Sequence, residues 1–218
     1  MSTSSAAASD QPPYRQIRAV FDEAGVTVYQ AYKAGIALDA VRRGRFSNGY
    51  NRERMTWIKP SFLWMMYRSG WATKEDQEYV LAIRLNREGF EAALGDAVLS
   101  HFDPDRHEDE QAWRKALREA PVRVQWDPER DLRHTPLGYR AVQIGLSGRA
   151  VHEYCDTWIT GIEDTTPLAR QIHGLIREGR EDVARELLPR EVPYPLSVQL
   201  AAAIGATARP PLGRGEPI

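Results

Sequence analysis

The chain has 218 residues, of which 42% are hydrophobic and 27% are charged, as in an ordinary globular protein. Its formal net charge of −1 excludes a global field that would draw the whole molecule to nucleic acid or to an anionic membrane, so any electrostatic preference must be local. The single cysteine, Cys155, excludes an internal disulfide framework and a cysteine-rich zinc site.

The two ends of the chain differ in composition from its middle. Residues 1–12 are small and polar and lack the basic and apolar regions of a signal peptide, so they predict a disordered segment. Residues 189–218 are rich in proline and glycine and predict a tail with one docked turn near 196–204. We therefore expect one globular domain over 13–188 and, without an apolar stretch of membrane length, a cytoplasmic protein with no membrane partner.

Strand and helix patterns alternate along the first part of this domain. Residues 26–32 are β-branched and aromatic, which is typical of a strand. Apolar residues then recur at helical spacing over 36–41, and Gly44 suits the end of a helix. Pro60 begins a second expected helix, since proline is tolerated in the first turn, and Gly70 ends it.

The alternation continues in the second part without a regular rhythm. The expected elements are a strand over 79–85, helices over 87–94 and 112–120, strands over 122–126 and 139–146, a helix from a Ser147 cap to 159, and a helical pair over 165–188. Because the strand–helix–strand repeat of a parallel sheet is missing, we expect an α+β fold with a mixed or antiparallel sheet and packed helices.

Cations concentrate between the first helix and the end of the second. They are Arg42, Arg43, Arg45, Arg52, Arg54, Lys59 and Arg68. Guanidinium groups bind phosphate in a bidentate manner, which favours a nucleotide, a pyrophosphate or a nucleic-acid backbone as the ligand. The alternative interpretation is a solvated surface on which these residues pair with acids elsewhere.

The helix expected after Pro60 is unusually aromatic. Three tryptophans recur at intervals of seven from Trp57, and such a continuous apolar run predicts a helix that is buried on most sides. Most of the aromatic residues are therefore expected in the core. Lys59 and Ser61 lie at the start of the helix, where free N–H groups attract anions, and an aromatic plane nearby can stack a base or a nicotinamide.

An acidic segment, Gln125-Trp-Asp-Pro-Glu-Arg-Asp131, follows the strand expected over 122–126. Asp-Pro is a turn former, so one interpretation is a turn with capping and surface ion pairs. The other interpretation takes Asp127 or Glu129 as an acid, base or electrostatic stabiliser that meets the basic segment in one cleft. No glycine-rich phosphate loop is present, and residues 101–107 do not fit the calcium-loop template, so no metal site is predicted.

Four stretches of the sequence resemble a known family. They are Val28–Tyr32, Thr56–Trp71, Gln125–Arg130 and Gln143–Leu146. Together they resemble the family of domain of unknown function 4291. The order of a first strand, a helix, an aromatic helix and a late strand followed by a glutamate is more distantly similar to the ADP-ribosyltransferases, and this resemblance implies an ADP-ribosyltransferase-like fold.

The distant resemblance also implies a site that uses NAD. The catalytic residues implied are Glu129, as the acid that stabilises oxocarbenium character while the nicotinamide–ribose bond breaks, and Tyr67. The residues expected to bind NAD are Gln30, Tyr32, Arg54, Trp57, Lys59, Ser61 and Arg68. The hypothesis is therefore an NAD-dependent ADP-ribosyltransferase-like enzyme that acts on a nucleic acid or a protein. The alternative is a non-catalytic module that binds nucleotides or nucleic acid.

Overall fold

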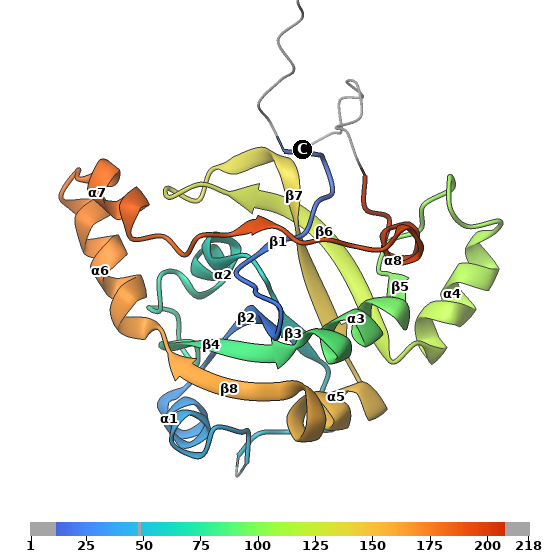
Figure 1. The fold of residues 1–218 in the computed structure, drawn as a ribbon, viewed down its shortest axis with the longest axis horizontal. Coiled ribbons are helices and arrows are strands. Elements are labelled where there is room, and N and C mark those ends of the chain that lie inside the picture. Colours follow the sequence, from blue (N-terminus) through green and yellow to red (C-terminus); the bar gives the residue numbers. More distant parts are fainter. Residues whose placement is uncertain (1–11, 48, 208–218) are drawn as a thin grey trace, which may run out of the picture.

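Two larger β-sheets lie at the centre of the computed structural model, which describes residues 12–47 and 49–207 (Figure 1). The strands are β1 (Arg18–Ala19), β2 (Gly25–Tyr32), β3 (Thr56–Ile58), β4 (Tyr79–Asn86), β5 (Ala97–Leu99), β6 (Val122–Arg130), β7 (Pro136–Leu146), β8 (Ile159–Asp164) and β9 (Val192–Pro193). The helices are α1 (Ala34–Arg43), α2 (Phe62–Ser69), α3 (Arg87–Gly95), α4 (Glu110–Glu119), α5 (Arg149–Glu153), α6 (Thr166–Arg177), α7 (Glu181–Glu186) and α8 (Val198–Ala203). A π-helical segment, Tyr154–Trp158, continues α5.

The two sheets meet beside the start of helix α2. One sheet has the antiparallel order β2-β4-β8, and the other has the order β3-β7-β6-β5, in which only β5 and β6 are parallel. The backbone N–H of Tyr29 on β2 donates to the carbonyl of Lys59, just after β3, at 2.7 Å. This architecture confirms the expected α+β fold with mixed and antiparallel sheets in one domain.

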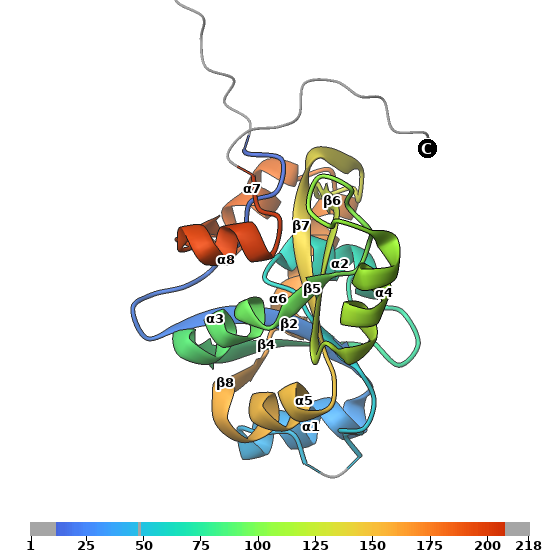
Figure 2. The same ribbon diagram turned by 90° about the vertical axis from the view of Figure 1, so that its right-hand side faces the viewer.

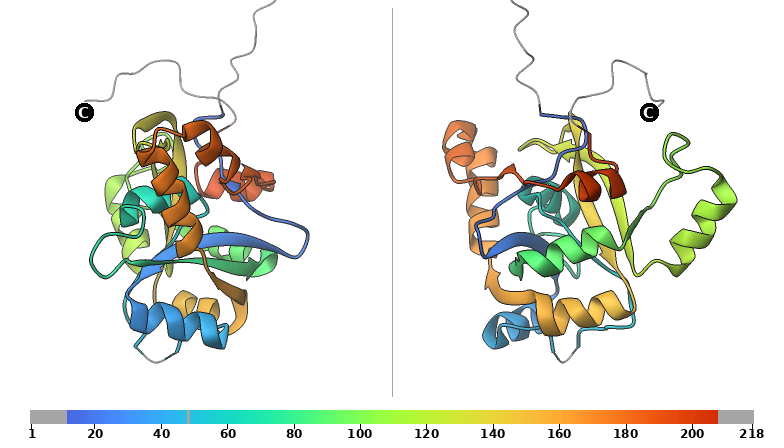
Figure 3. Two further views of the ribbon diagram at one scale, coloured as in Figure 1. Left: turned by 90° about the vertical axis from the view of Figure 1, so that its left-hand side faces the viewer. Right: turned by 45° about the vertical axis from the view of Figure 1, so that its right-hand side comes forward.

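The helices cover these sheets on several sides. Helix α1 packs on β2, β4 and β8, whereas α2 packs on β2 and β6. Figure 2 shows α1 and α5 together at one end of the molecule, with β6 and β7 rising away from them. Helix α4 lies at the periphery (Figure 3), and none of its residues is buried. The main core joins residues of both sheets to α1, α3, α5 and the π-helical segment, and a second cluster joins α2 to α6 and α7.

Local signals set the bounds of the two helices that flank the site. Gly44 follows α1 with φ of 65°, and Gly70 follows α2 with φ of 59°, a left-handed conformation that glycine adopts without a steric cost. Ser61 caps α2, because its side chain accepts a hydrogen bond from the N–H of Trp64 at 3.0 Å. Pro60 precedes this cap, so the helix begins slightly later than expected.

Two expectations were wrong. The segment from Gln125 to Arg130 is not a turn but the continuation of β6. Proline is tolerated at Pro128 because β5 pairs with β6 only as far as Val124, so this part of β6 has a neighbour on one side only. The helix expected from Ser147 to 159 is also interrupted.

The Ser147 hydroxyl does not cap that helix. It donates to the carbonyl of Pro121 at 3.1 Å, and α5 starts after Gly148. Ile159 begins β8, a strand that the sequence analysis missed.

The C-terminal segment contributes to the fold as far as the structure describes it. Strand β9 pairs antiparallel with β1, and Tyr194 and Ile204 are buried. Part of the tail expected over 189–218 is thus docked, and residues 208–218 lie outside the described residues. The disordered segment expected over 1–12 lies outside them too, apart from its last residue.

Candidate functional site

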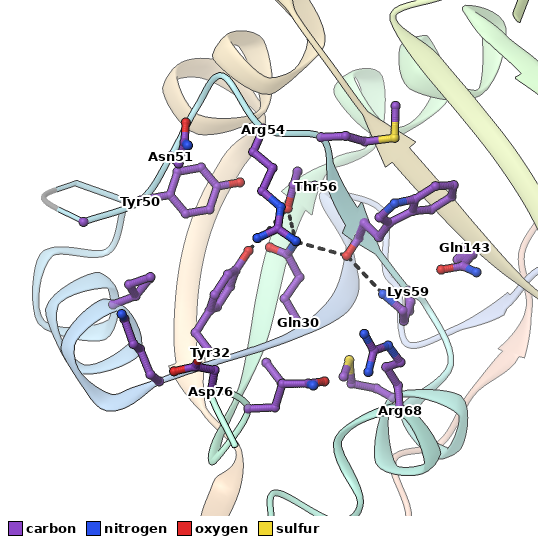
Figure 4. A pocket seen from close by; sticks show the side chains of 18 residues that line it. Gln30, Tyr32, Tyr50, Asn51, Arg54, Thr56, Lys59, Arg68, Asp76 and Gln143 are labelled. Carbon is purple, nitrogen blue, oxygen red and sulfur yellow. Dashed lines mark hydrogen bonds between the residues drawn. The ribbon is translucent and has the colours of Figure 1, made fainter. Parts of the chain in front are cut away.

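A cavity of about 560 Å³ opens where β2 and β3 meet (Figure 4). Its walls come from the end of β2, from residues 49–57, from helix α2, from residues 76–77 and from β7. Six of the residues predicted to bind a cofactor line it: Gln30, Tyr32, Arg54, Trp57, Lys59 and Arg68. Ser61, Tyr67 and Glu129 are not among its described lining residues. The structure therefore brings together most of the predicted binding residues but neither predicted catalytic residue.

A chain of hydrogen bonds forms one wall of the cavity. The buried hydroxyl of Tyr154 donates to Oε1 of Gln30 at 2.7 Å. Nε2 of Gln30 in turn donates to Oγ1 of Thr56 at 2.6 Å and to the carbonyl of Trp57 at 3.1 Å. The Tyr32 hydroxyl lies 3.3 Å from the same Thr56 oxygen. Gln30 thus joins β2 to β3 and holds this wall of the cavity in position.

Aromatic rings form the adjoining surface. Tyr50 stacks on Phe46 with ring centroids 4.2 Å apart, and the rings of Tyr32 and Tyr50 meet edge to face at 5.9 Å. Burial raises the pKa of Tyr32 to about 12, so its phenol is neutral at physiological pH. The ring of Trp57 lies over Gly145, where a Cβ atom would come within 2.9 Å of it. Glycine at this position therefore leaves room for the Trp57 ring.

Lys59 is the most unusual ionisable group of the cavity. Its side chain is nearly buried, with 6% exposure, and its Nζ donates to the carbonyl of Trp57 at 3.2 Å. The same Nζ lies 5.2 Å from the ring centroid of Trp64, which is a cation–π distance. Burial, followed by the positive charge of Arg68, lowers the pKa of Lys59 to about 7, although the charge of Asp127 opposes this shift.

The cavity carries an excess of positive charge. Its described lining residues include four bases, Lys33, Arg54, Lys59 and Arg68, against one acid, Asp76. None of these four bases forms an ion pair with a described residue. Unpaired cations on one concave surface favour an anionic ligand, and phosphate groups suit arginine in particular.

Other cations of the basic segment are paired on the surface. Arg42 and Arg43 both contact the carboxylate of Asp39 on α1, the second at 2.9 Å. Arg52 makes two hydrogen bonds of 2.8 Å to Asp156. Both interpretations of this segment thus apply to different residues: these three arginines pair with acids, whereas Arg54, Lys59 and Arg68 line the cavity.

Glu129 belongs to a separate cluster at the start of α2. It is 7% exposed, and its Oε1 accepts hydrogen bonds from Oγ of Ser61 at 3.0 Å and from the N–H of Arg130 at 2.8 Å. Burial raises its pKa above the ordinary value. Tyr67 is 37% exposed and packs on the guanidinium of Arg130, 4.0 Å from its ring centroid.

The N-terminus of α2 already holds a carboxyl group of the protein. Oε1 of Glu191 accepts the N–H of Phe62 at 2.6 Å, and burial raises the pKa of Glu191 to about 8. An anion was expected at this helix N-terminus, and the carboxyl group of Glu191 occupies that place, although with a pKa of about 8 it is mostly protonated at neutral pH. No local pattern points to Glu191, because it lies in a proline-rich stretch without periodicity.

The acidic segment does not line the cavity, but Asp127 supports one of its lining residues, Gln143. The two carboxylate oxygens of Asp127 accept hydrogen bonds from Nε2 of Gln125 at 2.8 Å and from Nε2 of Gln143 at 2.6 Å. Gln143 lines the cavity from β7 (Figure 4). Gln143 was not expected among the site residues, because only the pairing of β6 with β7 places it opposite Gln125 and beside Asp127.

Two absences hold for the described part of the chain. Within residues 12–47 and 49–207, no group of His, Cys, Asp or Glu side chains is arranged to hold a metal ion. No helix in these ranges is long and apolar enough to cross a membrane.

These features define an α+β protein with a cationic, partly aromatic pocket at the junction of two sheets. The model of one family, described as Domain of unknown function (DUF4291), matches residues 16–194. The chain belongs to this family, which confirms the nearer of the two resemblances. A comparison with curated proteins found no match.

Proposed function

We propose that the pocket binds NAD and that the protein is an ADP-ribosyltransferase-like enzyme. The observation that supports this proposal is the gathering of Arg54, Lys59 and Arg68, unpaired within the described structure, on one cavity that also contains the ring of Trp57. NAD carries two negative charges on its diphosphate and has flat rings at both ends, which suits a pocket with cations and a tryptophan ring. The cavity of about 560 Å³ falls in the size range of small-molecule sites.

The chemistry has a counterpart among the residues of the pocket wall. When the bond between nicotinamide and C1′ of the ribose breaks, its electron pair leaves with nicotinamide, and an acceptor nucleophile then adds to C1′ and releases its proton to solvent. Positive charge develops on the ribose in between, and a nearby negative dipole lowers the barrier. Gln143 donates its amide N–H to Asp127, which leaves its carbonyl oxygen for the pocket, and in this proposal that oxygen, supported by the Asp127 carboxylate, stabilises the charge.

Incubation with NAD tests the proposal. We expect the protein to release nicotinamide or to transfer labelled ADP-ribose to a protein or nucleic-acid acceptor. Gln143→Leu should slow this reaction at least about tenfold, which corresponds to a barrier increase of about 1.4 kcal/mol. Glu186→Gln, at an exposed position on α7, serves as the control and should react like the wild type. Absence of release, transfer and NAD binding would remove the proposal.

The second candidate is a non-catalytic module that binds nucleotides. The placement of Glu129 favours it, because the carboxylate that the distant resemblance implies is turned toward Ser61 and not into the pocket. This candidate predicts NAD binding in calorimetry without release of nicotinamide. Binding of a nucleic-acid backbone is less favoured, since Arg42, Arg43 and Arg52 are paired with acids; it would weaken steeply with added salt.

A further inference from the structure

Two cations of the pocket lie together without a counter-ion. Figure 4 shows the side chains of Lys59 and Arg68 turned toward the same part of the cavity, Lys59 from the segment after β3 and Arg68 from α2. Neither forms an ion pair with a described residue, and Asp127, the acid whose charge acts on Lys59, is hydrogen-bonded to Gln125 and Gln143. Two like charges in such a place repel each other unless an anion lies between them.

Burial makes this repulsion more costly for Lys59 than for Arg68. The Lys59 side chain is 6% exposed, whereas Arg68 is exposed to solvent. A buried ammonium ion without a paired carboxylate is unfavourable, and a lysine can escape this cost by releasing its proton, which an arginine cannot do. The single carbonyl of Trp57 that Nζ contacts is a weak substitute for a counter-ion.

We infer that Lys59 and Arg68 form a phosphate subsite in which the Lys59 amine takes up a proton when the phosphate binds. The inference rests on the proposed function because it assigns the phosphates of the same ligand, but it concerns binding and not turnover. The ligand class is a phosphate ester or diphosphate. One oxygen accepts from Nζ of Lys59 and the others face the guanidinium of Arg68, whose fork matches two phosphate oxygens.

The charged groups that face Lys59 set the direction of the proton transfer. Arg68 on α2 disfavours the ammonium form and Asp127 on β6 favours it, while Gln143 on β7 and the Trp57 carbonyl are neutral. Burial is the largest influence, and together these effects lower the pKa of Lys59 to about 7. At pH 8 such an amine is about one-tenth protonated, so a bound phosphate that restores the ammonium ion draws close to one proton from the buffer.

Calorimetry with ADP-ribose measures this proton directly. ADP-ribose contains the diphosphate but no nicotinamide, and the diphosphate does not titrate near pH 8. Titrations at pH 8 in two buffers of different ionisation enthalpy should give uptake of close to one proton per ligand. In addition, the affinity of the wild type should fall by up to about 25-fold between pH 7.5 and 9, in proportion to the protonated fraction of a free amine with a pKa of about 7.

Variants distinguish the subsite from a general effect of charge. Arg68→Met should weaken binding at least tenfold. Lys59→Arg keeps the positive charge but cannot titrate, so binding by this variant should show no proton uptake and no loss of affinity up to pH 9. Lys115→Met, which removes an exposed cation of α4, is the control and should bind like the wild type. Binding of ADP-ribose by the wild type without proton uptake overturns the inference.

A second measurement does not depend on the nucleotide or on the variants. The side-chain NMR signal of Lys59 should titrate near pH 7 in sodium chloride and at a higher pH in sodium sulfate of equal ionic strength, since sulfate resembles phosphate but does not itself titrate. Equal midpoints in the two salts would contradict the subsite. A sulfate-dependent shift without any NAD reaction would retain the subsite and reject the proposed enzyme. NAD turnover without proton uptake would retain the enzyme and reject the subsite.

Discussion

The hydrogen bond between Tyr154 and Gln30 gives the sharpest prediction about how the pocket wall is built. Tyr154 is fully buried, Gln30 is 3% exposed, and the bond between them measures 2.7 Å. Tyr154→Phe removes the donor and leaves Oε1 of Gln30 buried without a partner. An unsatisfied buried acceptor costs about 1–3 kcal/mol, so the free energy of unfolding should fall by that amount.

Urea unfolding followed by tryptophan fluorescence measures this change, and the m-value should stay constant while the midpoint falls. Tyr79→Phe is the matched control, because Tyr79 lies on the neighbouring strand and its hydroxyl makes no hydrogen bond with a described residue. We expect the control to change stability by less than about 0.5 kcal/mol. The explanation of the wall fails if the two variants are equally stable.

Two further predictions concern stability. The pKa of Glu191 is raised to about 8 in the fold, above its ordinary 4.5, so its stabilising contribution is full below about pH 4.5 and is lost as the pH rises toward 8. The free energy of unfolding of Glu191→Gln should therefore exceed that of the wild type by about 1 kcal/mol or more at pH 9 and equal it at pH 4.5. A difference in urea melts that does not depend on pH would refute this. Gly89→Ala places a Cβ 2.3 Å from the Trp158 ring and should lower the stability of the fold by about 1–3 kcal/mol. In Gly174→Ala the new Cβ meets no atom within 4 Å, so this variant should be neutral or more stable by about 0.5–1 kcal/mol. Thermal melts in which the two variants behave alike would contradict the packing of α3.

Much of the fold could be predicted because its signals are local. Helix α2 is an example: the Ser61 cap, the apolar run and Gly70 all lie within one short stretch, and the sequence analysis placed the helix to within two residues at its start. Strand β8 was missed for the opposite reason. Its six residues directly follow a helical segment, and its pairing with β4 joins positions some eighty residues apart, as between Leu81 and Asp164.

The candidate site divides in the same way. Arg54, Lys59 and Arg68 were found because cations and aromatic residues are dense in one stretch of sequence. Tyr154 could not be found, since 124 positions separate it from Gln30 and only the folded chain shows that they share a hydrogen bond. Glu129 lies in strand β6, where a bulge next to Pro128 shifts the register of the pairing with β7. No local pattern shows which way a side chain at such a bulge turns.

A crystal structure of the protein with NAD tests the central claim most directly, because it shows the ligand and the cations together. We expect the diphosphate to lie within hydrogen-bond distance of Lys59 and Arg68, and one of the ligand's rings to pack on Trp57. NAD bound at another surface, or bound in this pocket with its phosphates turned away from Lys59 and Arg68, would contradict the account.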